Sequence, residues 1–383
     1  MGPDCERLAP LLAGDRRRAP GHSGAPGPGA LFPSPPADQY RLVRGFAARR
    51  SGLKVLKLKP GCADEKAFVR PPAPVFLGIA GWVARATLGI AAMQIEPGQT
   101  VLLTGASGGL GSVMARALAD RRVRLFLVAH PGARLEPLAE ELRARGVEAE
   151  PCIADLRVAA ERHRVVQQVR RRFGPVDLLI NNAGVEHNGY YHRLAESEIE
   201  EVLSVNLVAA MMLTRLVWPE MLERRRGHVV NIASLAGKAG PAFQEPYAAS
   251  KAGLIAFTHA LRATYGGSGV SASVIVPGFV ETGMYERLKA LAGRPAPPLL
   301  AAVTPQRVVR ALFRAVERDL AEVLVTRYPV RPLLALLQLV PGASAWLTRC
   351  LGVNAFFHSA ACQATPREQG EERWVSGATA HKS

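Results

Sequence analysis

The stretch TVLLTGASGGLG, Thr100–Gly111, joins a short apolar run to a turn with spaced glycines. The apolar run has the length of a buried strand, and the residues after it, LGSVMARALADR, have the periodicity of a helix. In such a turn Gly105 permits a tight bend, Gly109 lets the backbone approach a pyrophosphate, and Gly111 allows close packing of helix on strand. The helix N-terminus adds N–H groups and the positive end of its dipole. The sequence therefore predicts a dinucleotide site at this turn.

The chain repeats this alternation of strand and helix up to about residue 330. Further apolar runs of strand length lie at 124–129, 148–156, 176–184, 228–234 and 270–278, with a last edge strand at 322–326. Helical patterns separate them, the longest over about 198–224. Strands that alternate with helices are typical of βαβ units and a parallel sheet. We therefore expect an α/β fold, with a Rossmann-type doubly wound parallel sheet between two layers of helices.

A tyrosine and a lysine stand four residues apart in PYAASKAGL, Pro246–Leu254, among small side chains. Residues with this spacing share a helix face, so Tyr247 and Lys251 point into the same space. A neighbouring ammonium favours the phenolate and lowers the pKa of the phenol, which would make Tyr247 a proton donor or acceptor near neutral pH. Taken alone, such a pair is more often an ordinary contact on a helix surface. The rest of the chain decides between the two interpretations.

The residues after the second apolar run indicate which nicotinamide cofactor is bound. An acidic residue about 20 positions after the glycines would bind a ribose 2′-hydroxyl, whereas a basic residue would accept a 2′-phosphate. The chain reads VAHPGARL here, with His130 and Arg134 and no acid. The sequence therefore favours NADP(H) over NAD(H), although a solvated helix arginine would leave the same pattern.

Several short motifs then follow in order: ADL at 154–156, NNAG at 181–184, SVNL at 204–207, NIAS at 231–234, YAASK at 247–251 and PGFVET at 277–282. Together with the TGxxxGxG turn, they resemble the short-chain dehydrogenase/reductase family over about residues 95–330. The resemblance implies an NAD(P)-dependent oxidoreductase of the carbonyl reductase or alcohol dehydrogenase type. It would transfer a hydride between the nicotinamide and a ketone or secondary alcohol.

The resemblance also implies a role for each motif residue. Tyr247 would act as general acid or base, and Lys251 would lower its pKa and hold the nicotinamide ribose. Ser234 would steady the carbonyl or alcohol, and Asn206 would anchor a water in the proton relay. No metal is expected. The candidate cofactor contacts are Gly105, Ser107, Gly109, Leu110, Gly111, His130, Arg134, Asp155, Leu156, Asn182, Ala183, Gly184, Tyr247, Lys251, Pro277, Gly278, Val280 and Thr282.

Other proteins on this fold fit the sequence less well. Sugar epimerases and dehydratases carry a different glycine spacing and a longer substrate domain. A catalytically silent NADP(H)-binding sensor or scaffold is the alternative to an enzyme, and its mark would be a broken Ser/Tyr/Lys set, which is complete here. The loop after the sixth strand, about 279–300, is apolar with basic positions. It favours a small-molecule substrate that is hydrophobic.

The segment 1–92 differs in composition from the rest of the chain. It holds 14 Lys and Arg against 6 Asp and Glu, or half of the net charge of +16, and 12 of the 29 prolines. We expect a basic, disordered extension and not a nucleic-acid arm, because aromatic residues do not interleave with the charges. The apolar run 76–95 is as long as a membrane span, but Arg85 at its centre argues against one. Met93 opens the catalytic domain, expected at 93–330, so the extension is interpreted as upstream of what that domain needs.

The segment 331–365 is an apolar extension beyond the catalytic domain. Its apolar runs include Arg331 and Arg349, and Pro341 breaks the first of them. We favour a helical cap over the substrate opening; peripheral contact with a membrane and a subunit contact are the alternatives. A polar tail is expected at 366–383. The five cysteines form no CxxC pair, which indicates a reducing compartment and a cytoplasmic protein. The family resemblance implies a homodimer or homotetramer.

Overall fold

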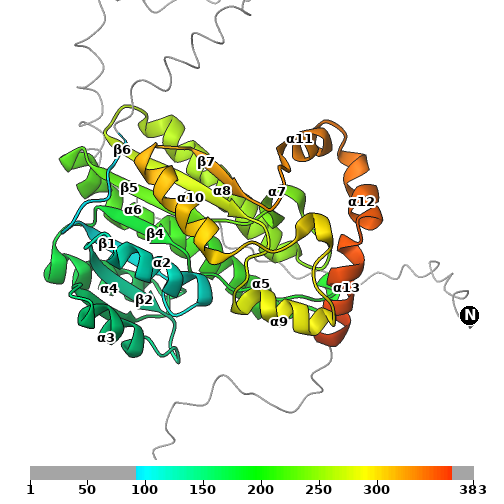
Figure 1. Cartoon of the computed structure of the whole chain (residues 1–383), viewed down its shortest axis with the longest axis horizontal. Helices are drawn as coiled ribbons and strands as arrows, with labels where there is room; N and C mark the ends of the chain where they lie inside the picture. Colours follow the sequence, from blue (N-terminus) through cyan, green and yellow to red (C-terminus); the bar gives the residue numbers. More distant parts are fainter. Residues whose placement is uncertain (1–91, 365–383) are drawn as a thin grey trace, which may run out of the picture. The chain divides into compact units, whose positions relative to one another are not determined.

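A computed structural model describes residues 92–364 of the chain (Figure 1). The expected basic extension up to residue 91, most of the apolar run 76–95 and the expected polar tail at 366–383 lie outside the described residues. Met93 and Ile95, at the start of the described part, are buried in the core beside the first strand and the first described helix.

Seven parallel strands form one sheet in the order β3-β2-β1-β4-β5-β6-β7. The order reverses between β1 and β4, which is the mark of a doubly wound sheet. Leu103 in β1 pairs with Leu127 in β2 on one side and with Ile180 in β4 on the other. The predicted fold class is confirmed, and the last strand lies at the sheet edge as expected. The strands are β1 (Thr100–Thr104), β2 (Arg124–Ala129), β3 (Ala149–Ile153), β4 (Leu178–Asn181), β5 (Gly227–Ile232), β6 (Val270–Pro277) and β7 (Glu322–Val325).

Helices cover both faces of the sheet (Figure 1). The helices of the described residues are α2 (Gly109–Ala119), α3 (Glu136–Ala144), α4 (Ala159–Phe173), α5 (Glu196–Leu203), α6 (Ala209–Arg224), α7 (Ala236–Ala239), α8 (Glu245–Tyr265), α9 (Gly283–Ala292), α10 (Pro305–Glu317), α11 (Arg331–Leu339), α12 (Pro341–Cys350) and α13 (Val353–Ala364). The helices α2, α3 and α10 pack on one face, and α4, α6 and α8 pack on the other.

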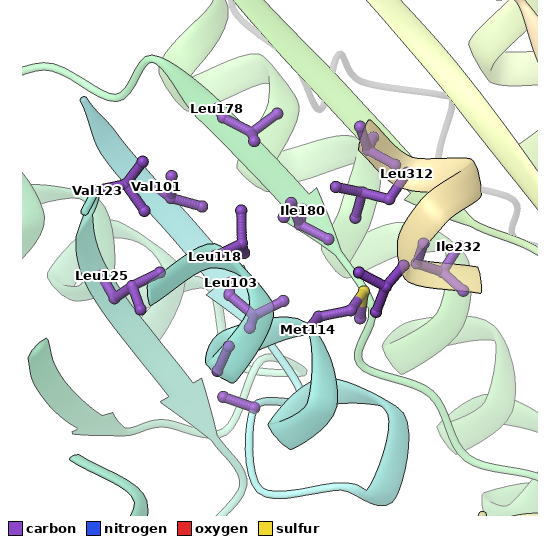
Figure 2. Close-up of a cluster of buried hydrophobic side chains, with 14 of the residues drawn as sticks. Val101, Leu103, Met114, Leu118, Val123, Leu125, Leu178, Ile180, Ile232 and Leu312 are labelled. Carbon is purple, nitrogen blue, oxygen red and sulfur yellow. The ribbon is translucent and has the colours of Figure 1, made fainter. Parts of the chain in front are cut away.

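The apolar character of the strands follows from this burial on two sides. Val101 and Leu103 point into the core beneath α2 and α10, whereas Leu102 between them points to the opposite face. Figure 2 shows the first of these cores, in which Met114 of α2 and Leu312 of α10 meet the strand side chains. Successive strand residues alternate between faces, so a strand covered on both sides is apolar at most positions.

The long helix predicted at 198–224 is confirmed over Glu196–Arg224, with a π-helical turn inside it. A π-helical turn, η3 (Ser204–Val208), separates α5 from α6, and Asn206 lies in its middle. By length and composition alone, the stretch Glu196–Arg224 is the one helix among the described residues that could cross a bilayer. Such a result is weak, because a core helix passes the same test, and α6 packs against the sheet. The π turn, a common feature of functional sites, is explained below by what Asn206 binds.

The last part of the described chain forms three helices at one end of the sheet (Figure 1). Helix α13 lies against α9, and α11 and α12 lead from β7 to it. This end is where the carboxyl ends of the strands open, so these helices stand next to the region in which ligands bind in such sheets.

Candidate active site

The glycine turn after β1 has a geometry that only glycine fits at two positions. Gly105 has a φ of +64°, and a Cβ there would lie 2.8 Å from the Cα of Ala183. A Cβ at Gly111 would lie 2.0 Å from the carbonyl oxygen of Gly105. The NNAG turn braces this loop, since Asn182 Nδ2 donates to the carbonyl oxygens of Thr104 and Gly105 at 3.0 and 3.1 Å.

The same loop fits a dinucleotide. Helix α2 begins after Gly108, and no side chain caps its N-terminus, so its first N–H groups point toward an anion site. At Gly109 a Cβ would come within 3.0 Å of the Cβ of Thr282, so the glycine turn and the loop after β6 approach each other closely. A Cβ at Gly184 would lie 3.3 Å from Asn206 Oδ1 and 3.4 Å from Lys251 Nζ. Glycines thus keep side chains out of the region between the turn and the lysine.

Tyr247 and Lys251 lie on α8, and both are buried. Lys251 Nζ donates a hydrogen bond to the carbonyl oxygen of Ile232 at 3.0 Å and stands 5.6 Å from the centre of the Tyr247 ring. Ser234, in the loop after β5, hydrogen-bonds the Tyr247 hydroxyl. The predicted helical pairing therefore occurs, and the predicted serine lies beside it.

The pKa of Tyr247 moves in the direction opposite to the one expected from the sequence. Burial of the hydroxyl raises this pKa, the carboxyl of Glu186 raises it further, and only the bond to Ser234 lowers it. The lysine does not reverse this balance, and its own ammonium is desolvated in the same buried region. Burial lowers the pKa of Lys251 to about 8, against a rise caused by the charge of Glu186.

Asn206 joins three parts of the site. Its Oδ1 accepts from the Val185 N–H at 2.8 Å, and its Nδ2 donates to the Val185 carbonyl at 2.9 Å and to Ser250 Oγ at 3.1 Å. Ser250 Oγ in turn donates to the carbonyl of Tyr247 at 2.7 Å. These bonds draw the asparagine to the loop after β4 and to α8, and the π turn is the backbone geometry that accommodates them. The Asn206 side chain therefore connects the loop after β4 to α8. Its predicted role in holding a water stays a prediction.

Glu186 belongs to the site and was not singled out from the sequence. It is partly buried two residues after the NNAG motif, and its Oε2 accepts from Gln244 Nε2 at 3.2 Å. The same amide nitrogen donates to Asn188 Oδ1 at 2.7 Å. Burial raises the pKa of Glu186 to about 7, although Arg287 and Gln244 act in the other direction. The position of Glu186 directly after NNAGV is the sequence feature that could have identified it as a site residue.

The residues predicted to select the ribose lie beyond β2 and β3. His130 and Arg134 are both exposed at the end of β2. Asp155 forms an ion pair with Arg157 at 2.8 Å, and this hydrogen bond lowers the pKa of Asp155. The side chain of Leu156 is buried in the core between β2 and α4. The adenine contacts of these residues stay predictions.

The loop after β6 is fixed at both of its ends. The Pro277 carbonyl accepts from the Leu235 N–H at 2.7 Å, which ties the loop to the segment that carries Ser234. The Gly278 N–H donates to the Val325 carbonyl at 3.0 Å. Further along, Val280 forms an isolated parallel bridge with Val303. Thr282 follows as the N-cap residue of α9.

Aromatic side chains gather between this loop and α13, and we name them the aromatic cluster. Phe279 of the loop lies 5.6 Å from Phe356 and 6.0 Å from Phe357 of α13, measured between ring centres. On the opposite side, the Tyr190 hydroxyl lies 2.9 Å from Nε2 of His358. The members are Tyr190, Phe243, Phe279, Tyr285, Phe356, Phe357 and His358. The cluster joins α13 to the loops that follow β4 and β6.

Comparisons with known proteins agree with this geometry. The family model described as short chain dehydrogenase matches residues 99–292. Ketoacyl reductase HetN of Nostoc sp. is 43% identical over 251 residues, which are 65% of this chain and 86% of that protein. The 3-oxoacyl-(acyl-carrier-protein) reductase FabG of Escherichia coli is 32% identical over 50% of this chain and 77% of its own.

A solved structure gives the same result. The crystal structure of a variant actinorhodin polyketide ketoreductase with NADPH has a TM-score of 0.55 and 31% sequence identity to this chain, and the match covers 63% of this chain and 98% of that one. The glycine turn, the Ser234–Tyr247–Lys251 set and these relatives lead to one assignment. The chain belongs to the short chain dehydrogenase family and is an oxidoreductase on an NAD(P)-binding Rossmann-type sheet.

Proposed function

We propose that this protein is an NADP(H)-dependent carbonyl reductase whose substrate is a ketone with a hydrophobic group, and that Tyr247 is its general acid. One observation carries the proposal: the fold brings Ser234, Tyr247 and Lys251 together at the end of the sheet where the glycine turn opens. The ketoreductase names of the relatives and the NADPH in the solved neighbour support the direction and the cofactor.

In this proposal, different residues of the chain bind the cofactor, position the substrate and transfer the proton. When bound, the nicotinamide cofactor supplies the hydride that adds to the carbonyl carbon. The uncapped N-terminus of α2 would hold the pyrophosphate, and His130 and Arg134 would accept the 2′-phosphate. Ser234 would hydrogen-bond the carbonyl oxygen, and Tyr247 would give that oxygen its proton as negative charge develops on it. Tyr247 is protonated at neutral pH, since the ordinary pKa of a tyrosine is about 10 and burial raises that of Tyr247, so its proton is available in this direction.

The aromatic cluster supports the substrate class. Phe279 directly follows the Pro277–Gly278 turn at the nicotinamide end, and the rings of α13 pack onto it. Apolar rings beside a reacting carbonyl favour substrates with an aliphatic or aromatic group. In this proposal α13 is the cap predicted from the sequence. Keto esters and ketoacyl thioesters with long chains are therefore the first substrates to assay. The homo-oligomer and the cytoplasmic location stay predictions from the sequence.

The proposal is tested by following NADPH absorbance with purified full-length protein and a series of ketones of increasing chain length. We expect turnover with NADPH well above that with NADH, and kcat/KM that rises with chain length. Tyr247→Phe should lower kcat by about 10²–10⁴-fold and leave NADPH affinity unchanged. Tyr265→Phe, on the same helix, is the matched control and should retain activity. Tight NADPH binding with no turnover of any ketone or alcohol would instead favour the sensor or scaffold.

A further inference from the structure

The segment Arg331–Cys350, which comprises α11 and α12 and which we name the arm, presents large apolar side chains to solvent. Leu336, Leu339, Val340 and Trp346 are 55%, 80%, 50% and 64% exposed. Single exposed apolar residues are normal on proteins, but a group of them within one short segment marks an interaction surface. Leu336 and Leu339 have the i, i+3 spacing that places them on one side of α11, and Val340 follows directly at its C-terminus.

The rest of the described chain does not cover this surface. Helix α11 contacts α7 and α12, and α12 contacts α13. Arg331 Nη2 donates to the Glu322 carbonyl at 3.3 Å, which holds the start of the arm to β7. In Figure 1 the arm, drawn in orange, curves outward from the sheet. The arm is therefore joined to β7, α7 and α13, and Leu336, Leu339, Val340 and Trp346 stay exposed in spite of these contacts.

The charge of this region limits what can cover the surface. From Val323 to Ala364 the sequence has no acidic residue and three arginines, Arg327, Arg331 and Arg349, in a chain that holds 32 acidic residues in all. Exposed leucines and a tryptophan flanked by arginines are the composition of segments that lie in the interface of an anionic bilayer. A second copy fits less well, because a two-fold contact would bring like charges together without a carboxylate to pair with them.

We propose that the arm docks this protein on the surface of an anionic lipid bilayer. Leu336, Leu339 and Trp346 enter the boundary between headgroups and acyl chains, and the net positive charge of the region attracts the lipid phosphates. The arm lies on the membrane and does not span it, since α11 has 9 residues and α12 has 10, whereas a spanning helix needs about 20. Docking here would place α13, and with it the aromatic cluster, close to the lipid.

The test is flotation of the full-length protein with vesicles of phosphatidylcholine alone and with added phosphatidylglycerol. We expect binding to the anionic vesicles that weakens as salt is raised. The double variant L336E/L339E should bind at least about tenfold more weakly. Val158→Glu is the matched control, because Val158 is an exposed apolar side chain outside the arm. Since all three positions are exposed, the variants should keep the thermal unfolding profile of the natural chain.

Two further readouts make the result specific to the arm. Hydrogen exchange of residues 331–350 should slow when anionic vesicles are added. Equal flotation of the double variant and the natural chain would overturn the proposal, because another segment would then bind the lipid. An absence of flotation would also overturn it. A third contrary result would come from sedimentation without lipid. If the natural chain were a dimer and the double variant a monomer, the surface would be a subunit contact.

Discussion

The active site has two halves whose shapes are held by different contacts. The cofactor half runs from β1 to the Asn181–Gly184 turn, and the substrate half runs from the loop after β6 to α13. In the cofactor half, glycines bring backbone against backbone, and Asn182 fixes the glycine turn through two hydrogen bonds. In the substrate half, rings pack on rings, and Tyr190 reaches His358 from 168 residues earlier in the chain. The first half has no room for a Cβ at Gly105 or Gly111, whereas the second can be reshaped one side chain at a time.

This difference explains how the two halves can serve different purposes. A dinucleotide always presents the same phosphates and ribose, so a site built from backbone groups suits it. Substrates differ, and side chains from the late part of the chain can change without disturbing that backbone site. Changes confined to one half should therefore leave the other half working, and the variants below test this separation.

The largest loss of packing energy should come from truncating the aromatic cluster. Phe356 is 1% exposed, and replacing a buried phenylalanine by alanine costs about 3–5 kcal/mol of packing. In Phe356→Ala we expect α13 to loosen, with faster hydrogen exchange over 353–364 and a KM for long-chain ketones raised about tenfold. The NADPH affinity should stay unchanged. Phe356→Leu is the milder control, and a loss of NADPH binding in either variant would show that the halves are not separate.

The next largest effect should come from the glycine turn. Gly111→Ala places a Cβ 2.0 Å from the Gly105 carbonyl oxygen. Forced repacking of this kind costs about 1–3 kcal/mol, so NADPH affinity should fall by about 10- to 100-fold in a fluorescence titration. Gly108→Ala in the same loop is the control, because its φ is −71° and its nearest neighbour would lie at 3.4 Å. Equal affinities in the two variants would contradict the proposed backbone site.

A smaller effect should follow from removing one contact of α13. Tyr190→Phe loses the hydrogen bond with His358, and such a bond contributes about 0.5–1.5 kcal/mol. We expect the KM for a hydrophobic ketone to rise by about two- to fivefold, with kcat and NADPH affinity unchanged. Tyr191→Phe, at the neighbouring exposed tyrosine, should behave as the natural chain does. A change in kcat would mean that this bond supports the catalytic residues and not the cap.

The smallest effect should be a pH-dependent one at Glu186, where the two halves meet. Burial raises its pKa from 4.5 to about 7, so between these pH values the folded protein binds a proton that the unfolded chain has released. Stability should therefore fall as pH rises through this range. Glu186→Gln removes that loss, so thermal melts should match the natural chain near pH 4.5 and show a gain on the order of 1 kcal/mol at pH 8. If the difference in unfolding free energy between Glu186→Gln and the natural chain were the same at both pH values, the carboxyl of Glu186 would be hydrated and its pKa not raised.

The active-site set shows how far sequence reasoning reached. The seven strands were predicted close to their observed ends, and the structure brings Ser234, Tyr247 and Lys251 together as the motif order implied. The long helix predicted at 198–224 is present over Glu196–Arg224, but its π turn was not predicted, because Asn206 bonds to a loop that is not its neighbour in sequence. The expected fall in the pKa of Tyr247 was wrong. Helical spacing shows that the lysine is near, but not how deeply the hydroxyl is buried.

The sequence by itself determined the elements whose causes are local. Strand periodicity, the glycine spacing at Gly105 and Gly111, and the i, i+4 pair on α8 each depend on a few consecutive residues. Only the tertiary structure decided the rest: the role of Glu186, the bond between Tyr190 and His358, and the division of the final segment into a packed α13 and an exposed arm. These features depend on burial and on contacts between distant segments, and neither quantity exists until the chain has folded.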